Sequence, residues 1–147
     1  MKKITLLLTA LIASAMNSFA QINITKITID QKEHFIANSI GYPIIGQYNY
    51  VNQLEPITIL NPDGTGMIQN EDLEKNNIIW GIECSESGIP IFKEGFNSAS
   101  YTFWYRITGN AEAKSSDDKN WIQQSFTIHY DKKKIFISGD RVKEYIE

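Results

Sequence analysis

Residues 61–72 read NPDGTGMIQNED, and two different structures fit these letters. One is a calcium-binding loop, in which Asn61, Asp63 and Asp72 supply oxygen ligands around a central glycine. The other is the tip of a β-hairpin, in which Asn61 caps a turn, Pro62 sets the first corner and Gly64 adopts positive φ. The choice decides whether the segment holds a metal ion or only reverses the chain.

The residues on either side favour the hairpin. A calcium loop of the EF-hand type needs a helix on each side. Residues 56–60, PITIL, begin with proline and continue with β-branched side chains, which are poor helix formers. Residues 76–84, NNIIWGIEC, also have the composition of a strand. We therefore expect a hairpin, with a weak calcium site at its tip kept as the alternative and no other cofactor.

The rest of the chain repeats the same pattern of short strands separated by turn residues. Such spacing is typical of an all-β sandwich or barrel, and the length fits a single domain. Residues 31–40 are the only stretch that we expect to form a short helix, and residues 109–120 should be a surface loop. The expected strands cover residues 22–29, 46–51, 56–60, 66–70, 78–84, 89–93, 100–108, 121–130, 134–138 and 142–146.

Aromatic residues mark the faces of the expected strands. Trp80 shares one strand face with Ile78 and Ile82, and Tyr101, Phe103 and Tyr105 share one face of a later strand. These aromatic residues should therefore face inward, where they either line a ligand pocket or fill the core. Trp104 falls on the opposite, polar face of its strand. Together with Trp121 it either forms an exposed aromatic patch for a partner or sugar, or packs at the rim under the polar loop of residues 109–120 or under the N-terminal residues 21–45.

Three of these stretches together resemble the opening of small bacterial lipocalin-like domains. The matching residues are GQYNY at 46–50, the hairpin ITILNPDGTGMI at 57–68 and the tryptophan strand IIWGIE at 78–83. Two features depart from that pattern, because Tyr48 stands where the family has tryptophan and residues 21–45 form an N-terminal extension. The resemblance implies an antiparallel up-and-down barrel of about eight strands, wide enough to hold one small ligand.

The first twenty residues have the features of a secretion signal. Lys2 and Lys3 precede an apolar stretch that is too short to span a bilayer, and small residues end at Ala20, where we expect cleavage. The remaining chain would be exported to the periplasm or the medium. It would carry 12 basic and 17 acidic residues once Lys2 and Lys3 are removed from the 14 basic residues. This net charge of −5 disfavours nucleic acid and anionic membranes as partners.

Residues with catalytic or metal-binding chemistry are few. His34 and His129 have no ligand-like spacing and are expected at the surface, while Cys84 alternates with Trp80 and Ile82 and should be a packed, unreactive thiol. We therefore expect a non-enzymatic barrel that binds a small apolar or aromatic ligand in its interior. The alternative is a module that binds another protein through loops and edge strands, and an enzyme is the least favoured class.

Overall fold

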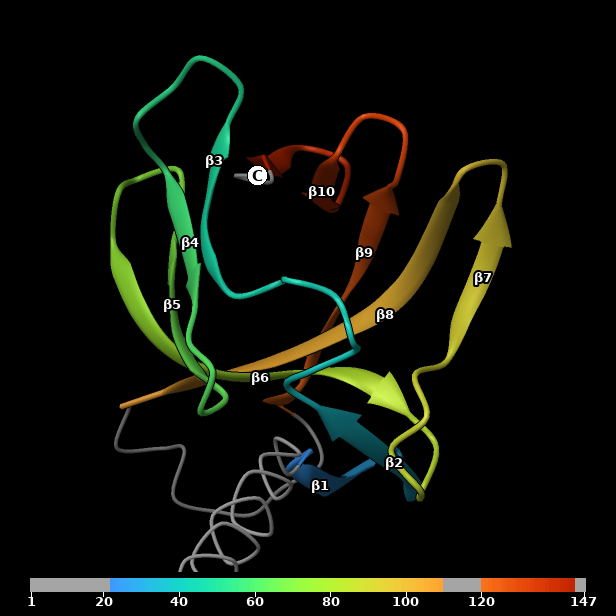
Figure 1. Cartoon of the computed structure of the whole chain (residues 1–147). Helices are drawn as coiled ribbons and strands as arrows, with labels where there is room; N and C mark the ends of the chain where they lie inside the picture. The colour runs from blue at the N-terminus through green and yellow to red at the C-terminus, as the bar shows by residue number, and fades with distance from the viewer. Residues whose placement is uncertain (1–21, 110–119, 145–147) are drawn as a thin grey trace, which may run out of the picture.

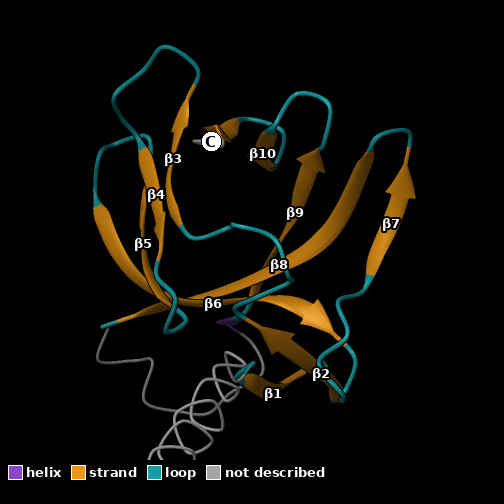
Figure 2. Cartoon of the chain, viewed as in Figure 1, coloured by secondary structure: helices purple, strands orange, loops and turns teal. Residues whose placement is uncertain are grey.

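The computed structural model describes residues 22–109 and 120–144, and its regular elements are β-strands. Figure 2 shows that strands and loops make up almost all of the described chain. Within these residues, no helix is long and apolar enough to cross a membrane. The leader expected at residues 1–20 and most of the surface loop expected at residues 109–120 lie outside the described residues. The strands are β1 (Ile24–Ile29), β2 (Lys32–Ala37), β3 (Gly46–Tyr50), β4 (Ile57–Leu60), β5 (Thr65–Gln69), β6 (Lys75–Cys84), β7 (Phe92–Gly95), β8 (Ser98–Thr108), β9 (Ile122–His129), β10 (Lys134–Ile137) and β11 (Arg141–Glu144).

Eight of these strands form a closed antiparallel barrel. Strands β3, β4, β5, β6, β8, β9, β10 and β11 each pair with the next, and β11 returns to β3 through the partners Val142 and Asn49. Figure 1 shows these strands curving around a common interior. The all-β, up-and-down barrel predicted from the sequence is therefore confirmed.

The three remaining strands extend the barrel wall where β6 and β8 separate. The two strands pair as far as Ile82 and Phe103. Beyond that point the end of β6 takes β2 as a partner, with Phe35 opposite Cys84, whereas the start of β8 takes β7. The hairpin of β1 and β2 is thus attached to one end of the barrel wall, and β7 forms an outer edge (Figure 1).

The helix predicted over residues 31–40 is wrong, because this segment contains strand β2. Asp30 and Gln31 both have positive φ, 48° and 65°, and they reverse the chain between β1 and β2. The segment then pairs on both sides, with β1 and with the end of β6. These tertiary pairings override a weak local helix preference.

The hairpin predicted at residues 61–64 is confirmed. Strands β4 and β5 pair with Leu60 opposite Gly66, and Gly64 takes φ of +82°. The carboxylate of Asp63 accepts hydrogen bonds from the backbone N–H of Thr65 at 3.0 Å and from its hydroxyl at 2.6 Å, which lowers the pKa of Asp63. The side chain of Asp63 therefore braces the turn itself.

The structure does not bring the proposed calcium ligands together. Asp63 precedes β5, whereas Asp72 follows it in the turn to β6, where its carboxylate accepts a hydrogen bond from the N–H of Glu74 at 3.0 Å. A five-residue strand separates the two turns by about 16 Å. No cluster of three or more potential metal-ligating side chains occurs within the described residues.

Replacing Gly64 with alanine should destabilise the protein more than the same change at Gly139. Both glycines have positive φ, +82° and +80°, so both variants incur the ~1 kcal/mol cost of a left-handed residue with a Cβ. A Cβ at Gly64 would also lie 2.7 Å from the amide nitrogen of Asn38, which donates to the carbonyl of Trp80, whereas nothing lies within 4 Å at Gly139. Urea unfolding measures both changes, and equal losses would contradict the role assigned to Asn38.

Candidate functional site

The segment between β2 and β3, residues 38–45, closes one end of the barrel. It runs from β2 to β3 across the face of the barrel turned to the viewer in Figure 1. At its start Asn38 donates a hydrogen bond to the carbonyl oxygen of Trp80 at 2.7 Å. Near its end Ile44 is 1% exposed, and the buried hydroxyl of Tyr48 donates to the Ile44 carbonyl at 2.5 Å. Burial also raises the pKa of Tyr48 above its ordinary value.

Large side chains fill the middle of the barrel. Trp80 and Phe103 are 1% and 0% exposed, and their ring centroids lie 6.0 Å apart. The indole N–H of Trp80 donates to the carbonyl of Thr65 at 2.8 Å, which satisfies its one polar atom. Tyr101 is 8% exposed, and burial, reinforced by a hydrogen bond with Tyr130, raises its pKa to about 12. All four predicted pocket residues, Trp80, Tyr101, Phe103 and Tyr105, therefore pack in the core.

The opposite end of the barrel holds a cavity of about 520 Å³, which we call the cup. Its floor is apolar and belongs to the core, since Ile68, Tyr105 and Ile137 are each less than 10% exposed. Its rim comes from the turns between β5 and β6 and between β10 and β11. The residues that line the cup are Tyr50, Ile68, Asn70, Glu71, Asp72, Tyr105, Gln124, Ile137, Ser138, Asp140 and Arg141.

Arg141 places a positive charge in the wall of the cup. Its guanidinium donates hydrogen bonds to the Thr58 hydroxyl and to the Gln69 carbonyl, and it lies 5.6 Å from the ring centroid of Tyr50. Burial raises the pKa of Tyr105, and the Arg141 charge opposes that shift, so the phenol lies within the field of the guanidinium. Within the described residues, no carboxylate forms an ion pair with Arg141.

Strand β11 turns its basic side chains toward the interior. Arg141 pairs with Ile137 and Lys143 pairs with Ile135, and both isoleucines belong to the buried core. Directly opposed residues in an antiparallel pair point to the same face of the sheet. Lys143 lies toward the closed end, where its ammonium donates to the carbonyls of Pro43 and Ile45. The two cations thus occupy the two ends of one inward face.

A buried polar layer lies next to Arg141. Thr58 and Gln69 are 0% and 1% exposed. The side-chain amide of Gln69 accepts from the N–H of Ile57 and donates to Glu55 and to the carbonyl of Leu73. Buried polar groups with partners hold a fixed geometry. Arg141 therefore sits on a preformed support.

Of the two alternatives for Trp104, the exposed patch is wrong and packing beneath the N-terminal extension is confirmed. Trp104 is 6% exposed and clusters with Ile27 of β1 and Ile36 of β2. Gly81 allows this close approach, since a Cβ there would lie 2.7 Å from Ile36. The β1–β2 hairpin thus covers the outer face of the barrel at this point. Trp121 packs against the same cluster, with the Arg106 guanidinium 5.5 Å from its ring centroid.

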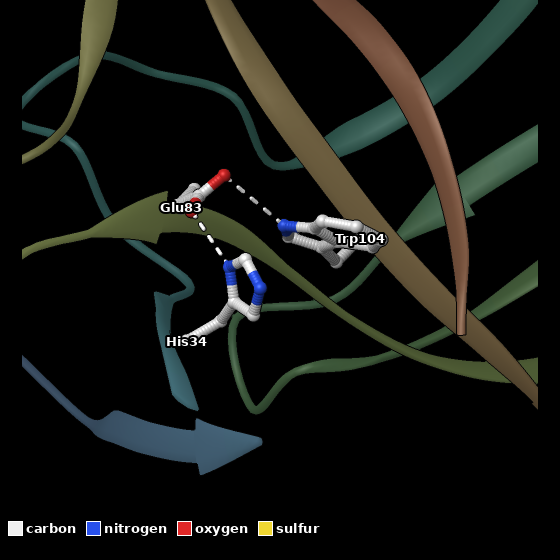
Figure 3. A network of polar contacts seen from close by, with 3 residues as sticks. All are labelled: His34, Glu83 and Trp104. Carbon is white, nitrogen blue, oxygen red and sulfur yellow. Dashed lines mark hydrogen bonds and ion pairs between the residues drawn. The ribbon is translucent and has the colours of Figure 1, made fainter. Parts of the chain in front are cut away.

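A polar network fastens this hairpin to the barrel. The carboxylate of Glu83 contacts Nδ1 of His34 at 2.9 Å and accepts a hydrogen bond from the indole N–H of Trp104 at 3.3 Å. Figure 3 shows both contacts converging on the one carboxylate. The side chain of His34 is 23% exposed, so the histidine expected at the surface is half-buried against Glu83. Its partners come from β6 and β8, which no local sequence pattern reveals.

Strand β7 is the most exposed edge of the sheet. All four of its residues are exposed, and Phe96 in the following turn is 96% exposed. The strand begins at Phe92, three residues later than predicted from sequence, because Pro90 instead forms an isolated bridge to Cys84. Cys84 is 2% exposed and burial raises the pKa of its thiol, as expected for a packed cysteine.

Most residues that line the cup were not predicted as site residues from the sequence. Tyr105 is the one residue predicted for an aromatic pocket that lines it, whereas Tyr50, Gln124 and Arg141 were missed. Gln124 could have been found from the sequence. It lies two residues from both Ile122 and Phe126, so it shares their inward face although it is polar. Arg141 had no such signal, since the apolar residue of its strand, Val142, points to the other face.

Comparisons of the chain with protein-family models, with characterised proteins and with solved structures gave no match. The resemblance to lipocalin-like domains is therefore confirmed only for its architecture, the closed eight-stranded antiparallel barrel with a buried aromatic cluster.

Proposed function

We propose that this protein is an exported, non-enzymatic carrier that binds a small, flat, apolar or aromatic ligand in the cup. The observation that carries this proposal is the cavity of about 520 Å³, which has an apolar floor and a polar rim at one end of a closed barrel. Ligand pockets of small molecules commonly have volumes of about 300–1,000 Å³ and combine apolar walls with a few placed polar groups.

The site is shallower than the hollow interior expected from the sequence. Trp80 and Phe103 already occupy the middle of the barrel, so the ligand would rest on Tyr105, Ile68 and Ile137 rather than among all the inward aromatics. A phenol ring and two aliphatic side chains suit the face of a bicyclic ring system. The closed barrel beneath provides a rigid floor, which limits the conformational entropy lost on binding.

Titration with N-phenyl-1-naphthylamine, a neutral aromatic probe that fluoresces in apolar surroundings, tests this proposal. We expect saturable binding to the wild type. The variant Gln124→Trp should abolish it, because the new indole would fill the cup from the wall to which Gln124 contributes. The matched control is Gln123→Trp on the same strand, since Gln123 is exposed and is not among the residues that line the cup.

Two results would refute the proposal. The first is the absence of saturable binding to folded wild-type protein. The second is equal binding by the two tryptophan variants, which would place the probe elsewhere. The exposed Phe96 is the most obvious competing site, so Phe96→Ser should leave the affinity unchanged.

A further inference from the structure

The strongest unexplained feature of the cup is the unpaired charge of Arg141. A guanidinium carries five N–H donors in a planar fork. Two of them bond to Thr58 and to the carbonyl of Gln69. The remaining three have no acceptor within the described residues, and the side chain is only partly buried and lines the cup, so a ligand in the cup can reach these donors. The barrel therefore binds two N–H donors of Arg141, and the other donors can bind a ligand.

From this geometry we propose that the ligand carries an anionic group, a carboxylate or sulfonate, that binds the free N–H groups of Arg141 while its ring rests on Tyr105. This inference rests on the proposed function and specifies its ligand class. Charge-assisted hydrogen bonds from a guanidinium to a carboxylate are roughly twice as strong as neutral ones and are often bidentate. Because Thr58 and Gln69 already fix the guanidinium, little side-chain entropy remains to be lost on binding.

The acidic residues of the rim do not reverse this preference. Glu71, Asp72 and Asp140 line the cup but are exposed, so water and salt screen their fields. The carboxylate of Asp72 also accepts a backbone hydrogen bond. Arg141 is only partly exposed and lies beside a buried polar layer, where charges are screened less. The sign of the ligand is therefore set by Arg141.

The other cation of β11 is a useful internal comparison. Lys143 also lies on the inward face, but two backbone carbonyls already accept its hydrogen bonds at the closed end, and burial lowers its pKa. Backbone carbonyls of the chain therefore bind the ammonium of Lys143. Arg141 is the inward cation of this strand that lines the cup, and it retains more free donors than Lys143.

Competition between two isosteric ligands tests the inference. With N-phenyl-1-naphthylamine as the fluorescent reporter, we measure its displacement by 2-naphthoate and by the neutral 2-naphthamide. We expect naphthoate to bind at least about tenfold more tightly, as charge-assisted hydrogen bonds imply. In Arg141→Gln the two affinities should converge, whereas Lys134→Gln, which removes a partly exposed positive charge near the closed end, should keep the difference.

The possible outcomes test the anionic ligand and the carrier function separately. Equal affinities of naphthoate and naphthamide for the wild type, or a preference that persists in folded Arg141→Gln, would overturn the inference while reporter binding upholds the carrier function. Failure of the reporter itself to bind would instead remove the carrier function. If circular dichroism shows that Arg141→Gln does not fold, the salt dependence of the wild type decides. A naphthoate affinity that falls with added salt, beside an unchanged naphthamide affinity, supports the inference, and parallel behaviour refutes it.

Discussion

Trp80→Ala should lower the free energy of unfolding by about 3–5 kcal/mol, the usual cost of removing a large aromatic side chain from a core. Trp80 is 1% exposed, contacts Phe103, and donates its indole N–H to the carbonyl of Thr65. The change therefore opens a cavity and also removes a hydrogen bond across the β5–β6 pair. Since small domains have total stabilities of about 5–15 kcal/mol, this single substitution should bring the barrel close to unfolding.

Trp121→Ala is the matched control for this prediction. It removes the same side chain from a half-buried position on the outer face. We expect its effect to be no more than about one third of that of Trp80→Ala, because less area is withdrawn from water. Urea unfolding followed by circular dichroism measures both variants. Losses of similar size would mean that Trp80 does not occupy the centre of the core.

Gly66→Ala should be the most disruptive single-methyl change. The backbone of Gly66 does not have positive φ, so alanine there would ordinarily stabilise the chain by ~0.4–1 kcal/mol through the unfolded state. A Cβ would instead lie 2.3 Å from the carbonyl oxygen of Ile59 and 3.3 Å from the Trp80 ring. Because a backbone oxygen cannot rotate away, we expect a loss of about 3 kcal/mol or more.

Gly95→Ala separates this effect from a general intolerance of alanine. A Cβ at Gly95 would also make a short contact, 2.5 Å, but with the hydroxyl of Ser98, which can rotate away. We expect its midpoint of urea unfolding to change little. Stabilisation by Gly66→Ala, or equal losses at both glycines, would contradict the packing described for the β4–β5 hairpin against Trp80.

The two glycines of the stretch NPDGTG explain why a short local pattern was so informative. Gly64 provides the positive φ of the turn, and Gly66 leaves the space that Ile59 and Trp80 use. The turn itself imposes the requirement at Gly64, so local reasoning can detect it, whereas the space at Gly66 depends on contacts with Ile59 and Trp80 and was not predicted. Alternation along β8 likewise placed Tyr101, Phe103 and Tyr105 inside the barrel correctly.

The features that were missed depend on contacts between distant segments. The sequence left the burial of Trp104 open, because alternation gives the face of a strand but not what covers that face. The β1–β2 hairpin, which covers it, lies about 70 residues earlier and was itself predicted to be partly helical. Arg141 belongs to the candidate site only because β11 closes the barrel against β3 and thereby faces Thr58, which is 83 residues away in sequence.

The most direct measurement is a two-dimensional ¹H–¹⁵N NMR titration of the protein with N-phenyl-1-naphthylamine and then with 2-naphthoate. If the cup is the ligand site, the backbone signals of Tyr50, Tyr105 and Ser138 should shift saturably, and naphthoate should add a shift at Arg141. Signals of β7, for example Lys93, should stay in place. Shifts confined to β7 and Phe96, or none at saturating ligand, would contradict a carrier function of the cup.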